Sequence, residues 1–236
     1  MVQRNTSDED RFVASTFQVL NWAQKHTRAL VVGAVALAIG LLAVRYYVDF
    51  QKQVREAAST EIRNVRAELL SGDASQVVDQ LRAFLVQYEG SDYAQEARVL
   101  LAHSLLLSNR ASEAIEPARQ AMSDVGRDPL STRAAFLLAA AFEEVGDTAG
   151  AIQTYERIGE RERSRVLKTR GLEGAARLRA AFGDRTGAVA LYHELAALTP
   201  EEETARRMFY EMRAAELGAK ALGAQGSGTE EAEVTG

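Results

Sequence analysis

Hydrophobic and polar positions divide the chain into three regions. Residues 29–44 form a run of 16 residues without a charge, ALVVGAVALAIGLLAV. Residues 49–222 carry apolar positions three to four residues apart, the spacing of helices that bury one face. Residues 223–236, GAQGSGTEEAEVTG, are rich in glycine and glutamate and contain one large apolar side chain. The pattern predicts an all-α protein with a membrane helix, a helical domain and a disordered acidic tail.

The apolar run predicts a single transmembrane helix over residues 29–48. At about 1.5 Å per residue this length gives about 30 Å, the thickness of the hydrocarbon core of a bilayer. Trp22 lies before the run and Tyr46 and Tyr47 follow it, as expected of aromatic residues at the membrane interfaces. A cleaved signal peptide and a buried helix of a soluble protein are the alternatives. The 28 residues before the run, and the bulky residues directly after it, favour an uncleaved anchor.

The flanks of the predicted span leave its orientation open. Residues 1–28 and residues 45–64 each carry four Lys or Arg, so the positive-inside comparison is a tie. Residues 1–28 are predicted to form a separate segment with a short amphipathic helix over residues 8–27. Such a helix lies in the membrane interface or docks on a partner. A solvated tail is the alternative.

Small residues form a stripe along the predicted span, at spacings of four, three, four and three. The stripe consists of Ala29, Gly33, Ala36, Gly40 and Ala43. Small side chains on one face of a span let another transmembrane helix approach closely, so the stripe is a candidate packing face. The alternative is ordinary span composition, because alanine and glycine are frequent in membrane helices.

The helical domain repeats itself. Gly72, Asn109, Gly146 and Gly183 follow one another at intervals of 37 residues. Four further columns, seven residues before and five, nine and twelve residues after these positions, keep an apolar character in every unit. In that order they hold Val65, Ala102, Ala139 and Ala176; Val77, Ala114, Ala151 and Ala188; Leu81, Ala118, Tyr155 and Tyr192; Phe84, Ala121, Ile158 and Leu195. The period predicts four antiparallel helix pairs that share one core, each with a left-handed residue at its turn.

A final helix is predicted over Glu201–Leu222, after Pro200. Its first turn is acidic, which complements the helix dipole. Met208, Phe209, Met212 and Leu217 are expected to cover the last repeat, as a terminal cap does.

The pattern over residues 134–158 and 172–200 resembles the tetratricopeptide repeat, with its period lengthened by three residues. The order of parts over residues 8–222 resembles the ancillary Sec-translocon subunit family of bacteria: a short helix, one span with an aromatic exit, then helical repeats. This resemblance implies an inner-membrane protein with a cytoplasmic N-terminus and a periplasmic repeat domain. It also implies translocon subunits, periplasmic chaperones or client polypeptides as partners.

Composition excludes several function classes. The chain has no cysteine, so disulfide frameworks and thiolate chemistry are absent. With 28 basic and 33 acidic residues it carries a net charge of −5, which disfavours nucleic acid as a partner. Its three histidines lie far apart in sequence, and there is no phosphate-binding loop or nucleophile elbow. No catalytic residue, metal site, cofactor or small-molecule substrate is predicted, and we expect no enzyme.

The resemblance to tetratricopeptide domains implies a groove lined by the first helix of each repeat. Carried onto this sequence, the candidate groove residues are Arg66, Leu69, Val99, His103, Leu106, Arg133, Phe136, Arg170 and Arg177. Their mixture of arginine with apolar residues suits a bound segment that is partly apolar and partly acidic. The alternative is that they are ordinary solvated or packed helix residues.

Two functions follow as hypotheses. The first is a membrane-anchored interaction module of the Sec translocon that links emerging secreted or membrane proteins to periplasmic chaperones. The second is a scaffold or regulator of another envelope complex, such as that of cell division. A membrane-anchored enzyme ranks third.

Overall fold

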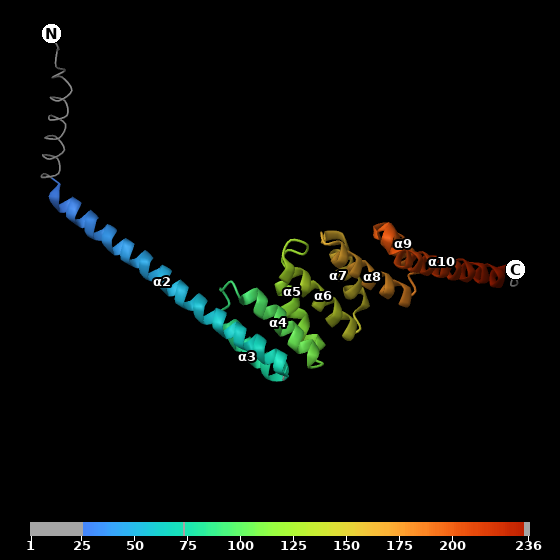
Figure 1. Ribbon diagram of the computed structural model, residues 1–236, viewed down its shortest axis with the longest axis horizontal. Helices are drawn as coiled ribbons and strands as arrows, with labels where there is room; N and C mark the ends of the chain where they lie inside the picture. The colour runs from blue at the N-terminus through green and yellow to red at the C-terminus, as the bar shows by residue number, and fades with distance from the viewer. Residues whose placement is uncertain (1–25, 73, 234–236) are drawn as a thin grey trace, which may run out of the picture. The chain divides into compact units, whose positions relative to one another are not determined.

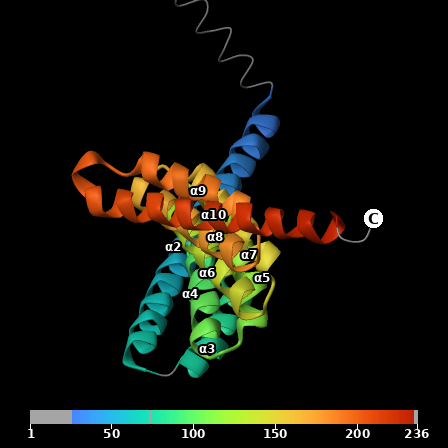
Figure 2. The ribbon, with the colours of Figure 1, turned by 90° about the vertical axis from the view of Figure 1, so that its right-hand side faces the viewer.

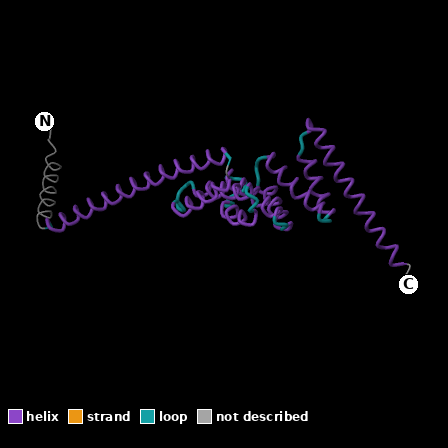
Figure 3. Tube along the Cα trace, turned by 90° about the horizontal axis from the view of Figure 1, so that it is seen from below, coloured by secondary structure: helices purple, strands orange, loops and turns teal. Residues whose placement is uncertain are grey.

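The computed structural model describes residues 26–72 and 74–233, with side chains described except at residues 29, 30, 34, 71 and 220–233. All regular structure within these ranges is helical (Figure 3). In chain order the elements are α2 (Thr27–Ser71), α3 (Ala74–Gln87), α4 (Ala94–Leu107), α5 (Ala111–Ala121), α6 (Pro129–Glu144), α7 (Thr148–Arg161), α8 (Arg165–Ala181), α9 (Arg185–Leu198), the short 3-10 helix η1 (Glu201–Glu203) and α10 (Thr204–Glu233) (Figure 1).

The chain divides into two compact units, residues 1–56 and residues 57–236. In the first unit, every described side chain from Val31 to Val48 is exposed. One helix among the described residues is long and apolar enough to cross a bilayer, with a mean hydropathy of 2.0 over its most apolar stretch. Uncovered leucine, isoleucine and valine side chains at this density are unfavourable in water, and a bilayer would cover them. The predicted amphipathic helix over residues 8–27 falls almost wholly in residues 1–25, outside the described residues.

The second unit consists of four helix pairs followed by one further helix. Residues 57–71 of α2 pair with α3, and α4, α6 and α8 pair with α5, α7 and α9. The pairs follow one another in chain order, and α10 packs against α9 (Figures 1 and 2). The predicted all-α architecture of about four helix pairs and a final helix is therefore confirmed.

The 37-residue period marks the turns between paired helices. The backbone φ angles of Gly72, Asn109, Gly146 and Gly183 are 136°, 56°, 79° and 89°. Glycine takes such values without the penalty that a Cβ imposes, and asparagine is among the better tolerated alternatives. At Asn109 the turn closes with a hydrogen bond of 2.8 Å from Arg110 N to the Leu105 carbonyl oxygen. This bond satisfies a carbonyl that the helix end would otherwise leave free.

The apolar columns of the repeat form the core. Every residue of the four columns is buried except Tyr155, which is half-buried. Small residues in the columns nearest the turn let the paired helices approach closely, while Phe84, Ile158 and Leu195 fill the space beyond them. A single pair could not bury both of its faces, so the stability of this domain depends on stacking of neighbouring repeats.

Aspartate side chains begin three of these helices. Asp128, Asp147 and Asp184 accept hydrogen bonds from backbone N–H groups in the first turns of α6, α7 and α9. Gln95 of α4 also donates a bond of 2.5 Å to Asp128. The cap of α6 therefore connects the second repeat to the third as well as starting the helix.

The buried face of the last helix, α10, is shifted by two residues relative to the 37-residue repeat. On α10 the buried face consists of Tyr210, Ala214 and Leu217. Its counterpart on α8 lies 39 residues earlier, at Gly171, Ala175 and Leu178, all buried. That face of α8 is directed at α7, because a Cβ on Gly171 would lie 2.9 Å from the Ile158 side chain. The segment between α9 and α10, which includes η1, accommodates the two-residue shift.

This shift corrects part of the prediction for the cap. Leu217 is buried as expected, but Met208 and Met212 are 62% and 61% exposed and do not cover the last repeat. In an unbroken 37-residue frame they would occupy the buried places of Gly171 and Ala175. The two-residue shift turns them to the outside instead.

Helix α10 is longer than predicted. The helix continues beyond Leu222 to Glu233, into the segment predicted to be a disordered tail, and residues 234–236 lie outside the described residues. Extending an existing helix avoids the cost of nucleation, although the three glycines at 223, 226 and 228 are poor helix formers.

Candidate functional site

The first cleft of the repeat domain, here called the N-terminal cleft, has a volume of about 420 Å³. It is lined by side chains of α2, α4 and α6: Arg66, Leu69, Leu70, Glu96, Val99, Leu100, His103, Leu107, Leu130 and Arg133. Five candidate groove residues therefore meet here, namely Arg66, Leu69, Val99, His103 and Arg133. The lining is mostly leucine and valine, so the cleft offers apolar surface with charged groups among it.

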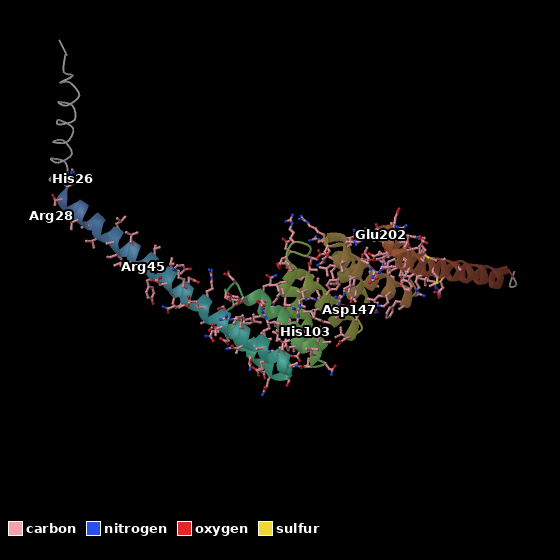
Figure 4. All side chains as sticks on the ribbon, in the orientation of Figure 1. His26, Arg28, Arg45, His103, Asp147 and Glu202 are labelled. Carbon is pink, nitrogen blue, oxygen red and sulfur yellow. The ribbon has the colours of Figure 1, made fainter. Side chains whose placement is uncertain are left out.

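The charges of the N-terminal cleft are unequally compensated. Arg66 forms an ion pair with Glu96. Arg133 is exposed, and no carboxylate of the described residues lies within ion-pair distance of it. Burial and the nearby Arg133 guanidinium lower the pKa of His103, so its imidazole is neutral at pH 7. Figure 4 labels His103 on α4. Its buried Nδ1 atom has no hydrogen-bond partner among the described residues. The uncompensated cation of this cleft is Arg133.

The second cleft, here called the C-terminal cleft, has a volume of about 720 Å³. It is lined by side chains of α6 to α10: Phe136, Ala140, Tyr155, Arg170, Glu173, Gly174, Arg177, Tyr192, Phe209, Tyr210 and Arg213. The candidate groove residues Phe136, Arg170 and Arg177 meet here. Aromatic rings and guanidinium groups dominate this lining.

Most polar groups of the C-terminal cleft are already paired. Arg177 forms an ion pair of 2.7 Å with Glu143, and the Tyr155 hydroxyl donates to the same carboxylate over 2.8 Å. Burial together with Glu143 raises the pKa of Tyr155 to about 12. The Tyr210 hydroxyl likewise donates to Glu173, and burial together with that carboxylate raises the pKa of Tyr210.

Arg170 is the exception in this cleft. Its guanidinium carbon lies 4.8 Å from the centre of the Phe136 ring. The side chain is exposed, and no carboxylate of the described part of the chain lies within ion-pair distance. The ring holds the cation in place without neutralising it.

The repeat relates the two uncompensated cations. Arg133 and Arg170 are 37 residues apart and hold the same position in consecutive first helices. Helix α6 contributes Arg133 to the N-terminal cleft and Phe136 to the C-terminal cleft, so it forms a wall of both. Leu106 is half-buried and lines neither cleft.

Comparison with known proteins shows which family has this architecture. The family model for the tetratricopeptide repeat-like domain matches residues 21–219. The chain belongs to the tetratricopeptide repeat-like family. Such repeats form a scaffold for interaction with other proteins and are typically non-catalytic. None of the curated proteins compared with the chain matches it.

Solved structures agree with the tetratricopeptide repeat-like fold. The chain is similar to a Podosopora anserina putative kinesin light chain with nearly identical TPR-like repeats, at 17% identity and a TM-score of 0.55, over 76% of this chain and 93% of that one. A variant of that protein with one substituted residue gives 17% identity and a TM-score of 0.56, over 76% and 92% of the two chains. At this identity the similarity concerns the fold alone.

Sequence reasoning missed part of the C-terminal cleft of this tetratricopeptide repeat-like protein. Tyr155 and Tyr192 stand in a column that the sequence analysis assigns to packing, and Phe209 and Tyr210 come from α10. A signal was present, because the same column holds Leu81 and Ala118 in the first two repeats. The tyrosines carry a hydroxyl that packing alone does not require.

A larger cleft of about 870 Å³ lies elsewhere in the domain, between α5, α6, α7 and α8. Its main cation, Arg179, is paired with Glu156 at 2.6 Å and with Asp184. Arg119 is likewise paired with Glu116, whereas Arg157 has no ion pair within the described residues. None of the candidate groove residues lines this cleft, which makes it a weaker candidate. Within the described ranges, no group of three or more His, Asp or Glu residues is arranged to hold a metal ion.

In the span, the described part of the small-residue stripe is exposed. Gly33, Ala36, Gly40 and Ala43 all lie at the surface of α2, while the side chain of Ala29 is outside the described residues. A Cβ added at Gly33 or Gly40 would have nothing of the described chain within 4 Å. The stripe is therefore open to a neighbouring helix.

Proposed function

We propose that the protein is a membrane-anchored interaction module whose two clefts bind an extended segment of a partner polypeptide. The observation that carries the proposal is the pair Arg133 and Arg170. These two cations hold the same repeat position, are exposed, and lack carboxylate partners in the described chain. Each stands at an apolar or aromatic cleft. The bound segment should present apolar side chains with carboxylates spaced among them.

Physical chemistry supports this composition. Tyrosine and arginine are over-represented among residues that dominate binding energy, especially where they surround a concave surface. A free guanidinium gains charge-assisted hydrogen bonds from a carboxylate, often two at once. Arg66 and Arg177 already have carboxylate partners within the chain. They would have to exchange these partners, and so they contribute less.

Residues 29–48 are proposed to anchor the protein in the inner membrane, with residues 1–28 in the cytoplasm and the repeat domain of residues 49–222 in the periplasm. The exposed apolar face of α2 supports the anchor. The resemblance to the ancillary Sec-translocon subunits supports the orientation. Translocon subunits, periplasmic chaperones or client polypeptides are the proposed partners, and residues 223–236 are proposed to be a tail outside the repeat fold.

A second candidate function is a scaffold or regulator of another envelope complex, such as that of cell division. The small-residue stripe favours it, because the exposed Gly33 and Gly40 would let the span itself dock on a membrane partner. In that case partner binding depends on the span more than on the clefts.

The test is affinity purification of the full chain from native membranes in mild detergent, with partners identified by mass spectrometry. The double variant Arg133→Glu/Arg170→Glu is compared with Arg127→Glu/Arg163→Glu, which makes the same charge change at exposed positions outside both clefts. We expect translocon subunits and periplasmic chaperones with wild type and the control, and loss of the chaperones or clients with the cleft variant. Equal recovery by both variants would contradict binding in the clefts. Recovery of division components instead would favour the scaffold.

Binding is then measured directly with purified full chain in detergent. The probe is a short fluorescent peptide of leucine, alanine and glutamate, compared with the same peptide carrying lysine in place of glutamate. We expect the acidic peptide to bind to the wild type. The double variant Arg133→Glu/Arg170→Glu should bind this peptide with an affinity lower by about tenfold or more, equivalent to about 1.4 kcal/mol. Equal binding of both peptides would show that Arg133 and Arg170 do not select carboxylates.

A further inference from the structure

The cleft of about 870 Å³ between α5, α6, α7 and α8, here called the α5–α7 cleft, is separate from the other two clefts. Its lining includes Arg119, Met122, Phe142, Ile152, Gln153 and Arg157. On α6, Phe142 lines this cleft, whereas Arg133 lines the N-terminal cleft. These two residues lie nine positions apart, about two and a half turns of helix, so they are on opposite sides of α6. On α8, the same separation relates Arg179 of the α5–α7 cleft to Arg170 of the C-terminal cleft.

The repeats on either side close the corresponding place with ion pairs. At the junction of the first two repeats, Arg82 on α3 pairs with Glu113 on α5 at 2.6 Å. At the junction of the last two repeats, Glu156 on α7 pairs with Arg179 on α8 at 2.6 Å. Arg82 and Glu156 lie 37 residues before and after Arg119, so all three hold the same position of the repeat. An ion pair at this position therefore joins neighbouring repeats at both of these junctions.

The middle junction lacks the residues for such a pair. Gly150 stands at the position of Glu113, and Phe142 stands at the position of Arg179. The ring of Phe142 packs closely on Gly150, because a Cβ there would lie 3.1 Å from a ring carbon. Where the neighbouring junctions have a salt bridge, the middle junction has an aromatic ring and an open cleft.

Two guanidinium groups are available at this cleft. Within the described residues, the one ion pair of Arg119 joins it to Glu116 on the same helix at 3.2 Å. Both side chains of that pair are more than half exposed, and such surface pairs contribute little to stability. Arg157 is half-buried and forms no ion pair within the described part of the chain. The carboxylate of Asp147, which also lines the cleft, accepts a hydrogen bond from the N–H of Gly150 as the cap of α7.

We propose that the α5–α7 cleft binds a segment of a second partner polypeptide, whose carboxylates pair with Arg119 and Arg157. These carboxylates would supply the charge that Glu113 supplies to Arg82 at the first junction. A large apolar side chain of the same segment would pack on the half-buried ring of Phe142.

The position of the cleft has a consequence for partner binding. Because it lies on the other side of α6 and α8, the domain can hold this segment together with a segment in the N-terminal and C-terminal clefts. The inference does not depend on what those two clefts bind.

The test uses purified full chain in detergent that carries Arg133→Gln/Arg170→Gln, which weakens binding in the other two clefts. The probe is the fluorescent peptide of leucine, alanine and glutamate. We expect this variant still to bind the peptide, and the further substitution Arg119→Gln/Arg157→Gln to lower the affinity by about tenfold or more. The same peptide with lysine in place of glutamate should bind more weakly than the acidic one.

The matched control adds Arg127→Gln/Arg163→Gln instead, which removes two exposed arginines outside the three clefts. No binding to the Arg133→Gln/Arg170→Gln variant, or an equal loss in the control, would overturn the proposal. If wild type and the Arg133→Gln/Arg170→Gln variant bind the peptide equally and only Arg119→Gln/Arg157→Gln weakens it, this inference holds and the proposed function of the other clefts fails.

A further variant places a carboxylate of the chain itself beside Arg157. Gln153 is exposed, lines the cleft and precedes Arg157 by four residues on α7. A glutamate four residues before a basic residue pairs with it across one helical turn, so Gln153→Glu should compete with the peptide and weaken its binding several-fold. Gln153→Leu, which is similar in size and uncharged, should retain the affinity, and circular dichroism checks the fold of both.

Equal peptide affinity of Gln153→Glu and Gln153→Leu would refute pairing of the partner with Arg157. The mass of the protein in the micelle, measured by light scattering, tests a different occupant. A dimer that Arg119→Gln/Arg157→Gln removes while peptide binding is unchanged would assign the cleft to another copy of this chain and overturn the proposal.

Discussion

The guanidinium of Arg170 lies against the ring of Phe136, with 4.8 Å between the guanidinium carbon and the ring centre. This contact joins the first helix of the fourth repeat to that of the third on the side of the clefts. Cation–π contacts at exposed sites contribute about 0.5–1 kcal/mol. The ring therefore orients the cation while leaving its N–H groups available to a carboxylate.

This relationship predicts different effects for two substitutions of Arg170. Arg170→Lys keeps the charge but loses the planar fork, and Arg170→Gln loses the charge as well. We expect affinity for the acidic peptide to fall a few-fold with lysine and about tenfold with glutamine, since a charge-assisted hydrogen bond contributes about 1.5–3 kcal/mol. Fluorescence anisotropy on the full chain in detergent measures both, with Arg163→Gln as control. Equal losses for the two variants would mean that the charge alone does not matter, and a lysine variant that binds like wild type would mean that the fork geometry does not matter.

Gly126 should tolerate alanine far less well than Gly146. Both have positive φ, at 88° and 79°. A Cβ at Gly146 meets nothing within 4 Å, whereas one at Gly126 would lie 2.0 Å from the Arg161 carbonyl oxygen. We expect Gly146→Ala to lower the free energy of unfolding by about 1–2 kcal/mol, the cost of the left-handed conformation. Gly126→Ala should lower the free energy of unfolding clearly more, because the loop must also move. Urea unfolding of the full chain in detergent measures both variants. Similar unfolding midpoints would contradict the predicted clash.

Removal of the Asp128 cap should destabilise the junction between the second and third repeats. Burial alone would raise the pKa of Asp128, but hydrogen bonds from Ser131, Gln95 and Leu130 outweigh it and the pKa lies below its usual value. Asp128→Ala should cost about 1–2 kcal/mol at pH 7. A carboxylate with a lowered pKa stabilises the fold above its unfolded pKa of about 4, and this stability is lost as the pH falls through the folded value.

The wild type should therefore lose more stability than Asp128→Ala between neutral and acidic pH. Thermal unfolding of both proteins at a series of pH values measures the difference. Parallel curves would show that the carboxylate is not held by these hydrogen bonds.

His103 should titrate below the ordinary histidine range. Burial lowers its pKa first, and the Arg133 guanidinium lowers it further. Because the unfolded chain takes up this proton near pH 6.5 and the folded chain does not, stability should decline as the pH falls below about 6.5. Proton NMR of the imidazole measures the pKa, and Arg133→Gln should raise it. An unchanged value in that variant would remove Arg133 as a cause.

In the span, the double substitution Gly33→Leu/Gly40→Leu tests whether another transmembrane helix packs on the small-residue stripe. A Cβ at either glycine contacts nothing of the described chain, so the substitution does not disturb this protein by itself. If another span packs on the stripe, co-purification of membrane partners should fall while helix content stays the same. Val32→Leu/Ile39→Leu, on other exposed positions of α2, is the matched control. Unchanged recovery with the glycine variant would remove the stripe as a packing face.

The repeat fold was predictable because its determinants are local. The turn residues at Gly72, Asn109, Gly146 and Gly183 and the apolar columns recur at one fixed interval, and each repeat packs on its neighbours in the same way. The outer position of Met208 was not predictable, because it depends on two extra residues before α10 that change which face meets α9. The hydrophobic periodicity of the sequence does not reveal this change, because the spacing of apolar residues within the helix stays the same.

Eight of the nine candidate groove residues line one of the two clefts and Leu106 lines neither, but the charge balance of the clefts was not predictable. Arg133 and Arg170 share one position of the repeat, and each lines a cleft. Which arginines remain uncompensated depends on side-chain contacts such as that between Arg177 and Glu143, 34 residues apart. The aromatic half of the C-terminal cleft depends on how α10 docks, which no local motif encodes.

The shared wall of the two clefts has a consequence for the length of a bound segment. Arg133 and Phe136 are three residues apart on α6 and line different clefts, so only about 4.5 Å of helix axis separates them at 1.5 Å per residue. A segment long enough to cross α6 can occupy both clefts, and its second contact then forms at high effective concentration. If the clefts bind a partner segment as proposed, a segment that fills both should dissociate more slowly than one that fills a single cleft. Retention of a bound segment would then depend on its length.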